Sequence, residues 1–441
     1  MSAENERQIV LEILTEVLEE KRFFHLVLHQ ALEKYAYLPE NKRAFISRLS
    51  RLTVERLLTL DAALSQVSSV PPARMKPVIR NILRMTACQI FWFDVPGYAA
   101  VSEAVKLTRI KGLAGLTGFV NAVSRAVLRK KDSFDFSESD EARYSMPEDL
   151  IRRIRTWYPA EADAFFQAQL SARQGTTIRI FRRSDLSRTL DLLSEDACTV
   201  RKAAYADRCF DVSGDLPMGE WRASREGLFE VMDAASALVV QCAAPEKNSL
   251  CLDLCGAPGG KSIGLADWME GSGLVECRDL SETRLSVAEE NAAQAGFTNL
   301  KFAASDAAQA RPEDAERYDL VLADLPCSGL GVLGRKPDLK YRITGKDLSA
   351  LADLQRRMLD TAMCAVKKGG VLIYSTCTIN PGENGKNADF ILRSSDFQPE
   401  SLRPYLGEVP EGCDPDTGRM QLLPGRNRCD GFFIARFRKS R

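Results

Sequence analysis

Histidine is nearly missing from this chain: only His25 and His29 occur among its 441 residues, both near the N-terminus. A Ser-His-Asp triad, a Cys-His pair or a histidine-based metal site is therefore very hard to build in the rest of the chain. Any active site must use other groups, and we expect no bound metal.

The twelve cysteines lack the spacing of a disulfide framework and include no C-x-x-C pair. They predict reduced thiols in a reducing compartment, and neither disulfides nor a zinc site. A basic and apolar leader is also missing, and no apolar run reaches about 18 residues, so export and membrane insertion are not expected. We therefore predict a cytoplasmic protein without a membrane partner.

An excess of charge of one sign is absent as well, because lysine plus arginine and aspartate plus glutamate each total 60. Any nucleic-acid partner must therefore be held by local basic patches. Hydrophobic residues make up 45% and charged residues 27%, which is ordinary for a globular protein. The length allows two or three domains with ample core, so we expect a multidomain chain.

The first part of the chain consists of helical patterns. Apolar residues recur at helical spacing, as from Ile9 to Leu18, and predict an all-α domain over residues 1–140. Residues 141–230 mix a helical segment with the strand candidates 176–180 and 208–212, and predict a small α+β region that links the domains. Its arginines fit an RNA contact and a solvated face equally well.

From residue 231 to 441, strand candidates alternate with helical stretches. The candidate strands are 250–254, 274–278, 300–304, 319–323, 371–376 and 432–437. This alternation predicts an α/β domain, an open parallel sheet with helices on both faces. In such sheets ligands bind beyond the carboxyl ends of the strands.

The first of these strands leads into the small-residue loop 255–261 and then into a helix, the order found in nucleotide-type ligand sites. Residues 255–262 also come within one residue of a P-loop, because Cys255 stands where the first glycine belongs. A P-loop nucleotide triphosphatase is therefore an alternative that the loop alone leaves open.

Acidic residues and thiols recur at the expected strand ends. Asp253, Asp279, Asp306 and Asp324 each end or follow a strand, and Cys327 and Cys377 follow the fourth and fifth strands. Singly, each aspartate fits a helix cap or a turn, and a lone cysteine fits a buried core position. Together they predict one rim where an acid binds a ribose diol and a thiolate adds to an electron-poor carbon.

Several spaced motifs resemble the RNA cytosine-C5 methyltransferases that use S-adenosylmethionine. They are Cys255-Gly-Ala-Pro-Gly-Gly-Lys261, Asp324-Leu-Pro-Cys-Ser-Gly329, Ser375-Thr-Cys377, and Leu423-Pro-Gly425 with Asp430-Gly-Phe-Phe-Ile-Ala435. The helical region, with Val101–Leu107 and Gly118–Val123, resembles the NusB-like domain of the RsmB/Sun/Fmu branch, which modifies bacterial 16S ribosomal RNA. Met232 and Phe181 depart from the common pattern of the family. These two departures affect the details of RNA contact that the resemblance implies.

The resemblance implies a Rossmann-like methyltransferase domain and a role for each motif residue. Cys377 is implied as the nucleophile that attacks C6 of cytosine, Asp324 as the partner of N3 with a raised or coupled pKa, and Cys327 as the group that assists release. Residue type alone leaves the two thiols exchangeable. The implied S-adenosylmethionine site contains Cys255, Gly256, Ala257, Pro258, Gly259, Gly260, Lys261, Asp279 at the ribose, Asp306 near the adenine and Asp324 beside the base pocket.

The expected partner is small-subunit ribosomal RNA, whose target base must leave its stack to reach two thiols in a cleft. The basic residues Arg335, Lys336, Lys340 and Arg342 and the tail 436–441 are expected to hold phosphates, although a solvated tail explains the latter equally well. We expect a monomer. A binding protein with an inactive catalytic half is the remaining alternative, and the intact Asp324, Cys327 and Cys377 argue against it.

Overall fold

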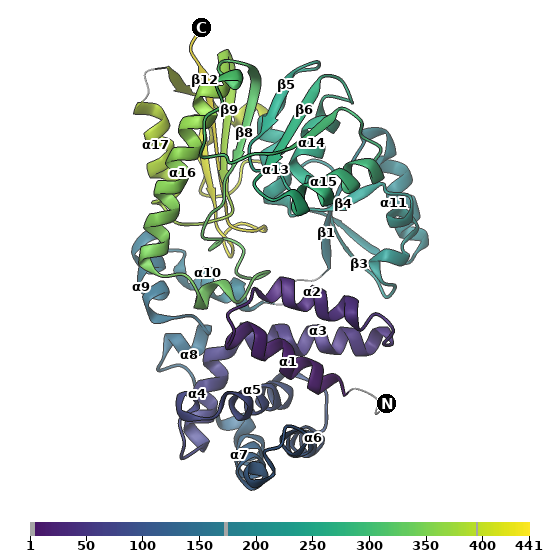
Figure 1. Ribbon diagram of the computed structural model, residues 1–441, viewed down its shortest axis with the longest axis vertical. Coiled ribbons are helices and arrows are strands. Elements are labelled where there is room, and N and C mark those ends of the chain that lie inside the picture. Colours follow the sequence, from purple (N-terminus) through teal and green to yellow (C-terminus); the bar gives the residue numbers. More distant parts are fainter. Residues whose placement is uncertain (1–4, 172–174, 394–395) are drawn as a thin grey trace. The chain divides into compact units, whose positions relative to one another are not determined.

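The computed structural model describes residues 5–171, 175–393 and 396–441 (Figure 1). The chain packs into two compact units, one of Met1–Leu170 with Leu333–Arg342 and one of Ser171–Val332 with Ile343–Arg441. Within the described ranges, no helix is long and apolar enough to span a bilayer. The division at 140 and 230 stays a prediction about domains.

The first unit is helical, as predicted. Its helices are α1 (Glu6–Leu18), α2 (Phe24–Lys34), α3 (Glu40–Glu55), α4 (Leu57–Val67), α5 (Pro77–Trp92), α6 (Gly97–Ile110), α7 (Thr117–Lys130), α8 (Asp140–Tyr144), α9 (Glu148–Trp157) and α10 (Ala162–Leu170). The apolar stripe of α1 packs into the same core as α5, α6 and α7. Helix α5 is buried from Ile79 to Ile90 apart from Arg80, which makes it the centre of the bundle.

A short segment from the second half of the sequence belongs to this first unit. Asp338 accepts a hydrogen bond from the Phe24 backbone N–H at 3.2 Å, and the Lys340 Nζ donates to the Glu55 carbonyl at 2.7 Å. Lys340 is 2% exposed, and burial lowers its pKa to about 7. The expectation that Lys340 holds an RNA phosphate is therefore wrong, because its ammonium group is buried in the helical unit.

The second unit contains a small antiparallel sheet in the order β2-β3-β1-β4. Its strands are β1 (Thr176–Ile180), β2 (Thr199–Lys202), β3 (Cys209–Ser213) and β4 (Phe229–Val231), flanked by α11 (Leu186–Glu195) and α12 (Arg222–Arg225). The two predicted strands are confirmed as β1 and β3. The other two are only three to four residues long, too short to show an alternating pattern.

The large sheet has the order β10-β12-β9-β8-β5-β6-β7, with β11 added on β12. Its strands are β5 (Leu250–Asp253), β6 (Leu274–Asp279), β7 (Leu300–Ala304), β8 (Tyr318–Asp324), β9 (Val366–Thr376), β10 (Phe397–Pro399), β11 (Arg419–Leu422) and β12 (Phe432–Lys439). Strands β5 to β9 are parallel, but β12 runs antiparallel to β9. The all-parallel prediction is wrong at this edge because β12 follows β11 through turns, without the helical crossover that parallel pairing needs.

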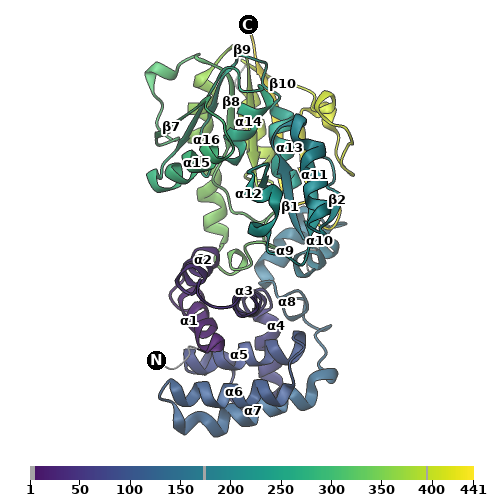
Figure 2. The same ribbon diagram turned by 90° about the vertical axis from the view of Figure 1, so that its right-hand side faces the viewer.

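Helices cover both faces of this sheet (Figures 1 and 2). They are α13 (Ala234–Ala243), α14 (Gly260–Trp268), α15 (Glu282–Gln294), α16 (Gly345–Ala365) and α17 (Gly385–Arg393). Alternate residues of β8 enter two separate cores: Leu320 and Leu322 pack with α13 and α14, while Val321 and Ala323 pack with α16 and α17. Because alternate side chains point to opposite faces, β8 lies between the two helical layers that cover the sheet.

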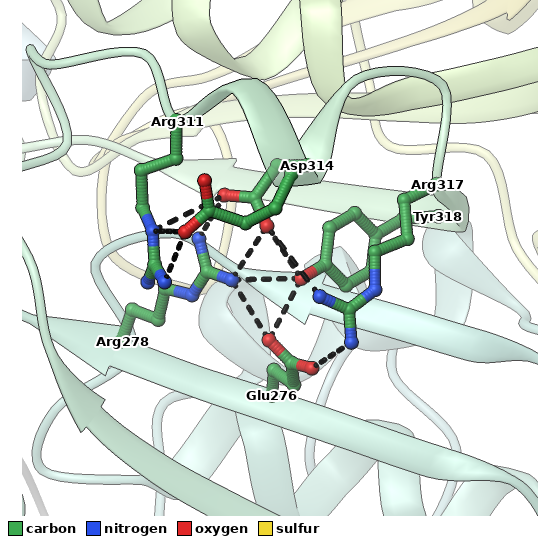
Figure 3. A network of polar contacts seen from close by, with 7 residues as sticks. Glu276, Arg278, Arg311, Asp314, Arg317 and Tyr318 are labelled. Atoms are coloured by element: carbon green, nitrogen blue, oxygen red, sulfur yellow. Dashed lines mark hydrogen bonds and ion pairs between the residues drawn. The ribbon is translucent and has the colours of Figure 1, made fainter.

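A buried charge network joins β6 to the start of β8 across β5, which lies between them in the sheet (Figure 3). Arg278 is 3% exposed, and its Nη2 donates to Glu276 at 2.8 Å, to Asp314 at 2.9 Å and to the Tyr318 hydroxyl at 2.7 Å. The hydrogen bonds from Arg278 hold the pKa of Asp314 below its ordinary value. Because buried charges are tolerated only when paired, this network anchors the strand that ends in Asp279.

Candidate functional site

Three acidic residues end neighbouring parallel strands. Strand β5 ends at Asp253, β6 at Asp279 and β8 at Asp324, and the pairing of β5 with both neighbours places these ends at one edge. Asp253 is fully buried, and its Oδ2 accepts a hydrogen bond from the Ser262 hydroxyl at 2.6 Å. Burial raises the pKa of Asp253 to about 7. Its Oδ1 has no partner among the described residues.

The loop 255–261 joins β5 directly to α14. Gly259 has a φ of 101°, which favours glycine, and a Cβ on Gly256 would lie 2.7 Å from the Ser262 hydroxyl. The Gly256 N–H donates to the Arg278 carbonyl at 2.7 Å, and the Asn291 side chain donates to the Pro258 carbonyl at 3.0 Å. The backbone of the loop is therefore held close to the end of β5 and to α15.

Asp279 and Asp306 differ in their surroundings. Asp279 is 4% exposed, accepts from the Ser281 N–H at 3.0 Å and forms an ion pair with Arg284 at 3.0 Å. Asp306 accepts from the Ala308 N–H and from the Gln309 side chain, both at 2.9 Å. These hydrogen bonds lower the pKa of Asp306. Asp279 therefore lies at the rim with Asp253 and Asp324, whereas the side-chain contacts of Asp306 are with its own turn.

Lys261 and Asp324 form an ion pair at the centre of the site. The Nζ–Oδ2 distance is 2.7 Å, and the Ser375 hydroxyl donates to the other Asp324 oxygen at 2.8 Å. Burial by itself lowers the pKa of Lys261, but the attraction of Asp324 outweighs it and the net shift is upward. Lys261 and Ser375 therefore each bind one oxygen of the Asp324 carboxylate.

The two predicted thiols converge. Their Sγ atoms are 3.3 Å apart, which is hydrogen-bond contact and too long for a disulfide bond. The hydrogen bond to Cys377 and then burial raise the pKa of Cys327 well above its ordinary value. Either sulfur can be the donor in this contact.

A buried polar cluster next to the two thiols was not predicted from the sequence. Ser328 and Thr378 directly follow the two cysteines, and their hydroxyls are 2.7 Å apart. Glu383, which is fully buried, accepts from Ser328 and from the Gln355 side chain. Glu383 lies six positions after Cys377 in a turn without periodic pattern, so the only available signal was an acid close to a predicted nucleophile.

The arrangement suits a neutral or positively charged ligand better than a nucleoside triphosphate. Lys261, which a P-loop would direct at phosphates, is paired with Asp324, and Asp279 is a further carboxylate at the same rim. A rim of carboxylates repels a triphosphate and attracts a cation. The glycine loop and the acid that ends β6 also fit a ligand that carries a ribose.

Two family models match the chain. The model described as 16S rRNA methyltransferase RsmB/F matches residues 240–438, and that of the NusB family matches residues 4–129. The chain is 32% identical to the Probable ribosomal RNA small subunit methyltransferase B of Bacillus subtilis (strain 168), over 98% of both chains. It is 29% identical to the Ribosomal RNA small subunit methyltransferase B of Shewanella oneidensis, over 99% of both.

Solved structures share the fold. The crystal structure of PH0851 matches with a TM-score of 0.82 and 23% identity, over 99% of both chains. The structure of NSun6 from Pyrococcus horikoshii with SFG matches with a TM-score of 0.58 and 22% identity, over 67% of this chain and 98% of that one. Taken with the full-length similarity to the bacterial relatives and the two matched family models, these findings show that the chain belongs to the 16S rRNA methyltransferase RsmB/F family.

Proposed function

We propose that this rRNA methyltransferase transfers a methyl group from S-adenosylmethionine to C5 of a cytosine in small-subunit ribosomal RNA. The observation that carries the proposal is the contact of Cys327 with Cys377 at 3.3 Å, beside the Lys261–Asp324 pair. C5 of cytosine is a poor nucleophile, and two thiols allow one to activate the ring while the other assists release. The curated relatives are named for small-subunit ribosomal RNA, and the NSun6 structure is described with SFG.

The rim of the sheet supports a site for the methyl donor. The loop 255–261 is assigned to the methionine moiety, Asp279 to the ribose, Asp306 to the region of the adenine and Asp324 to the border with the base pocket. S-adenosylmethionine, when bound, supplies a methyl group on a positively charged sulfur.

Cys377 is assigned as the nucleophile and Cys327 as its partner. The Cys377 thiolate adds to C6, the Sγ–C6 bond forms, and the electron pair of the C5–C6 double bond moves toward C5. That pair forms the bond from C5 to the methyl group; a base then takes the C5 proton, and the electron pair of the C5–H bond re-forms the C5–C6 double bond as the Sγ–C6 bond breaks and the Cys377 thiolate leaves. The raised pKa of Cys327 and the positive charge of Lys261 near Cys377 support this assignment.

A direct test of the proposed function uses the whole chain with rRNA. Unmodified small-subunit ribosomal RNA, incubated with the protein and S-adenosylmethionine, is expected to gain 5-methylcytosine at one position, read by bisulfite sequencing. Adenosine triphosphate in place of the methyl donor serves as the control for the P-loop alternative. Methylation at another base, at another ring atom, or not at all would contradict the proposal.

A groove between α6 and α7 in the first unit supports RNA capture by the helical region. Figures 1 and 2 show the two helices side by side. The groove has a volume of about 830 Å³, and no carboxylate occurs among its described lining residues. Its cations are Lys106, Arg109, Arg125 and Arg129, and Tyr98 at its rim is 75% exposed. Positive side chains with an exposed aromatic ring suit a single-stranded RNA backbone and its bases.

Removing two of these charges is expected to weaken RNA binding without regard to sequence. The affinity falls as salt rises, so the slope of log affinity against log salt is negative. Arg109→Gln with Arg129→Gln should make this slope shallower by roughly 0.7 to 0.9 for each phosphate that the protein no longer neutralises. Titration of fluorescent RNA at several salt concentrations measures the slope. Arg74→Gln, an exposed arginine of the same unit outside the groove, is the matched control. An unchanged slope in the double variant would remove the groove from the RNA interface.

A further inference from the structure

The residues that directly follow the two thiols are joined to each other. Ser328 is 2% exposed and Thr378 is fully buried, and their hydroxyl oxygens lie 2.7 Å apart. Because each is the next residue after a thiol, this contact couples the loop of Cys327 to the loop of Cys377. The coupling lies one peptide away from the reacting sulfur atoms.

The buried carboxylate of Glu383 accepts a hydrogen bond from Ser328 and so stabilises the contact between Ser328 and Thr378. Glu383 is fully buried, and its Oε2 accepts from the Ser328 N–H and the Gln355 Nε2, both at 2.9 Å. Its Oε1 accepts from the Ser328 hydroxyl at 2.5 Å and from the Asn380 Nδ2 at 2.9 Å. These four donors are uncharged, so they stabilise the ionised carboxylate without neutralising it.

The carboxylate also sets the direction of the hydroxyl contacts. An ionised carboxylate only accepts, so the single proton of the Ser328 hydroxyl points at Glu383. Thr378 must then donate its proton to Ser328. The chain Thr378, Ser328, Glu383 therefore has one arrangement of protons, and it joins both loops to α16 through Gln355.

The loops of the two thiols depend on the hydrogen bonds to Glu383 to different degrees. Strand β9 ends at Thr376, and Cys377 is the next residue, so the sheet itself places that thiol. Strand β8 ends at Asp324, three residues before Cys327, and Cys327 lies beyond the ladder. Backbone hydrogen bonds from the Leu325 N–H to the Ser375 carbonyl and from the Gly331 N–H to the Cys377 carbonyl, both at 3.1 Å, hold the two ends of the Cys327 loop. Between them Glu383 binds the loop twice, through the backbone and the hydroxyl of Ser328.

We infer that Glu383 is a positioning residue, which holds the Cys327 loop against the end of β9 so that Cys327 can serve in release of the methylated base. The inference rests on the proposed function and deepens it. The hydrogen bond to Cys377, burial and the charge of Glu383 all raise the pKa of Cys327, whereas Lys261 lies near Cys377.

Glu383→Gln keeps the size of the side chain but removes the charge and two acceptor positions. In one orientation the new amide N–H groups face the Ser328 N–H and the Gln355 amide, and in the other they face the Asn380 amide, so a donor meets a donor in both cases and the hold on the Ser328 loop is weakened. We expect turnover to fall by about 10², the range for a misplaced proton-transfer group. The covalent RNA adduct of Cys377 should nevertheless form and accumulate, because attack precedes release.

A double-variant cycle separates positioning from a general structural effect. In a Cys327→Ala background, Glu383→Gln should change the rate of adduct formation by less than about twofold, because the group that it positions is already gone. Glu400→Gln, which removes a partly buried carboxylate paired with Arg436 and Arg438, is the matched control and should not accumulate adduct. Methyl-donor affinity, measured by calorimetry, should be the same in Glu383→Gln as in the parent protein.

Two outcomes overturn the inference and differ from failure of the proposed function. If Cys327→Ala traps adduct but Glu383→Gln does not, or if Glu383→Gln slows adduct formation equally in both backgrounds, Glu383 does not act through Cys327. If Cys327→Ala itself traps no adduct, the proposed function is at fault. Full loss of methyl-donor binding in Glu383→Gln would show that the variant disturbs the fold, and Glu383→Asp, which retains the charge, then serves as the second variant and should recover turnover.

Discussion

Cys327→Ala is expected to accumulate a covalent protein–RNA complex, whereas Cys377→Ala is expected to form none. The thiol that attacks C6 is required to make the adduct, and the other is required only to resolve it. The contact at 3.3 Å and the raised pKa of Cys327 support Cys377 as the attacking group. With RNA and methyl donor present, the complex should survive denaturing electrophoresis and disappear after nuclease treatment.

Both cysteine variants should lose turnover by several orders of magnitude, so activity alone cannot separate attack from release. Cys364→Ala is the matched control, because Cys364 is an exposed cysteine of the same unit and should leave both turnover and adduct unchanged. The reverse pattern, with a trapped band in Cys377→Ala and none in Cys327→Ala, would make the thiol after Pro326 the nucleophile. The mechanism would then be that of a DNA cytosine methyltransferase.

Much of the fold was predictable because regular patterns encode it. The helical stripes of the first unit and the six strand candidates of the second follow periods of about 3.6 and 2, which local sequence shows directly. The antiparallel direction of β12 was not predictable in this way, because strand direction depends on how the chain returns to the sheet. Likewise, nothing local marks the segment containing Lys340 as part of the helical unit, since its partner Glu55 lies 285 positions away.

In the candidate site, too, residues in local sequence motifs were predictable, whereas their tertiary contacts were not. Spacing and resemblance predicted Cys327 and Cys377, and the structure places their sulfur atoms in contact. The partners of these residues were not predictable, because a buried hydrogen bond depends on tertiary geometry. Glu383 accepts from Gln355 on a helix 28 positions earlier, and Lys261 was assigned to the loop without its ion pair to Asp324.

Lys261→Met is expected to slow covalent attack on RNA by about 10² to 10³, the range for loss of one preorganised electrostatic group in an active site. Lys261 lies at 2.7 Å from Asp324, and the negative charge of a Cys377 thiolate contributes to the upward shift of the pKa of Lys261. By reciprocity, the ammonium group stabilises that thiolate. Without it, Asp324 remains as an uncompensated negative charge, so alkylation of Cys377 by iodoacetamide should move to higher pH.

The loss must be separated from instability, because removal of one partner of a buried ion pair costs about 3 to 5 kcal/mol. Asp324→Asn added to Lys261→Met removes both charges and should recover much of the free energy of unfolding, measured in urea, while adduct formation stays slow. Lys247→Met, at an exposed pair with Glu270, is the matched control and should change neither quantity appreciably. Mass spectrometry of the Cys377 peptide across pH gives the alkylation midpoint. A midpoint that stays in place in Lys261→Met would show that the ammonium group does not act on the thiolate, and that its role is confined to holding Asp324.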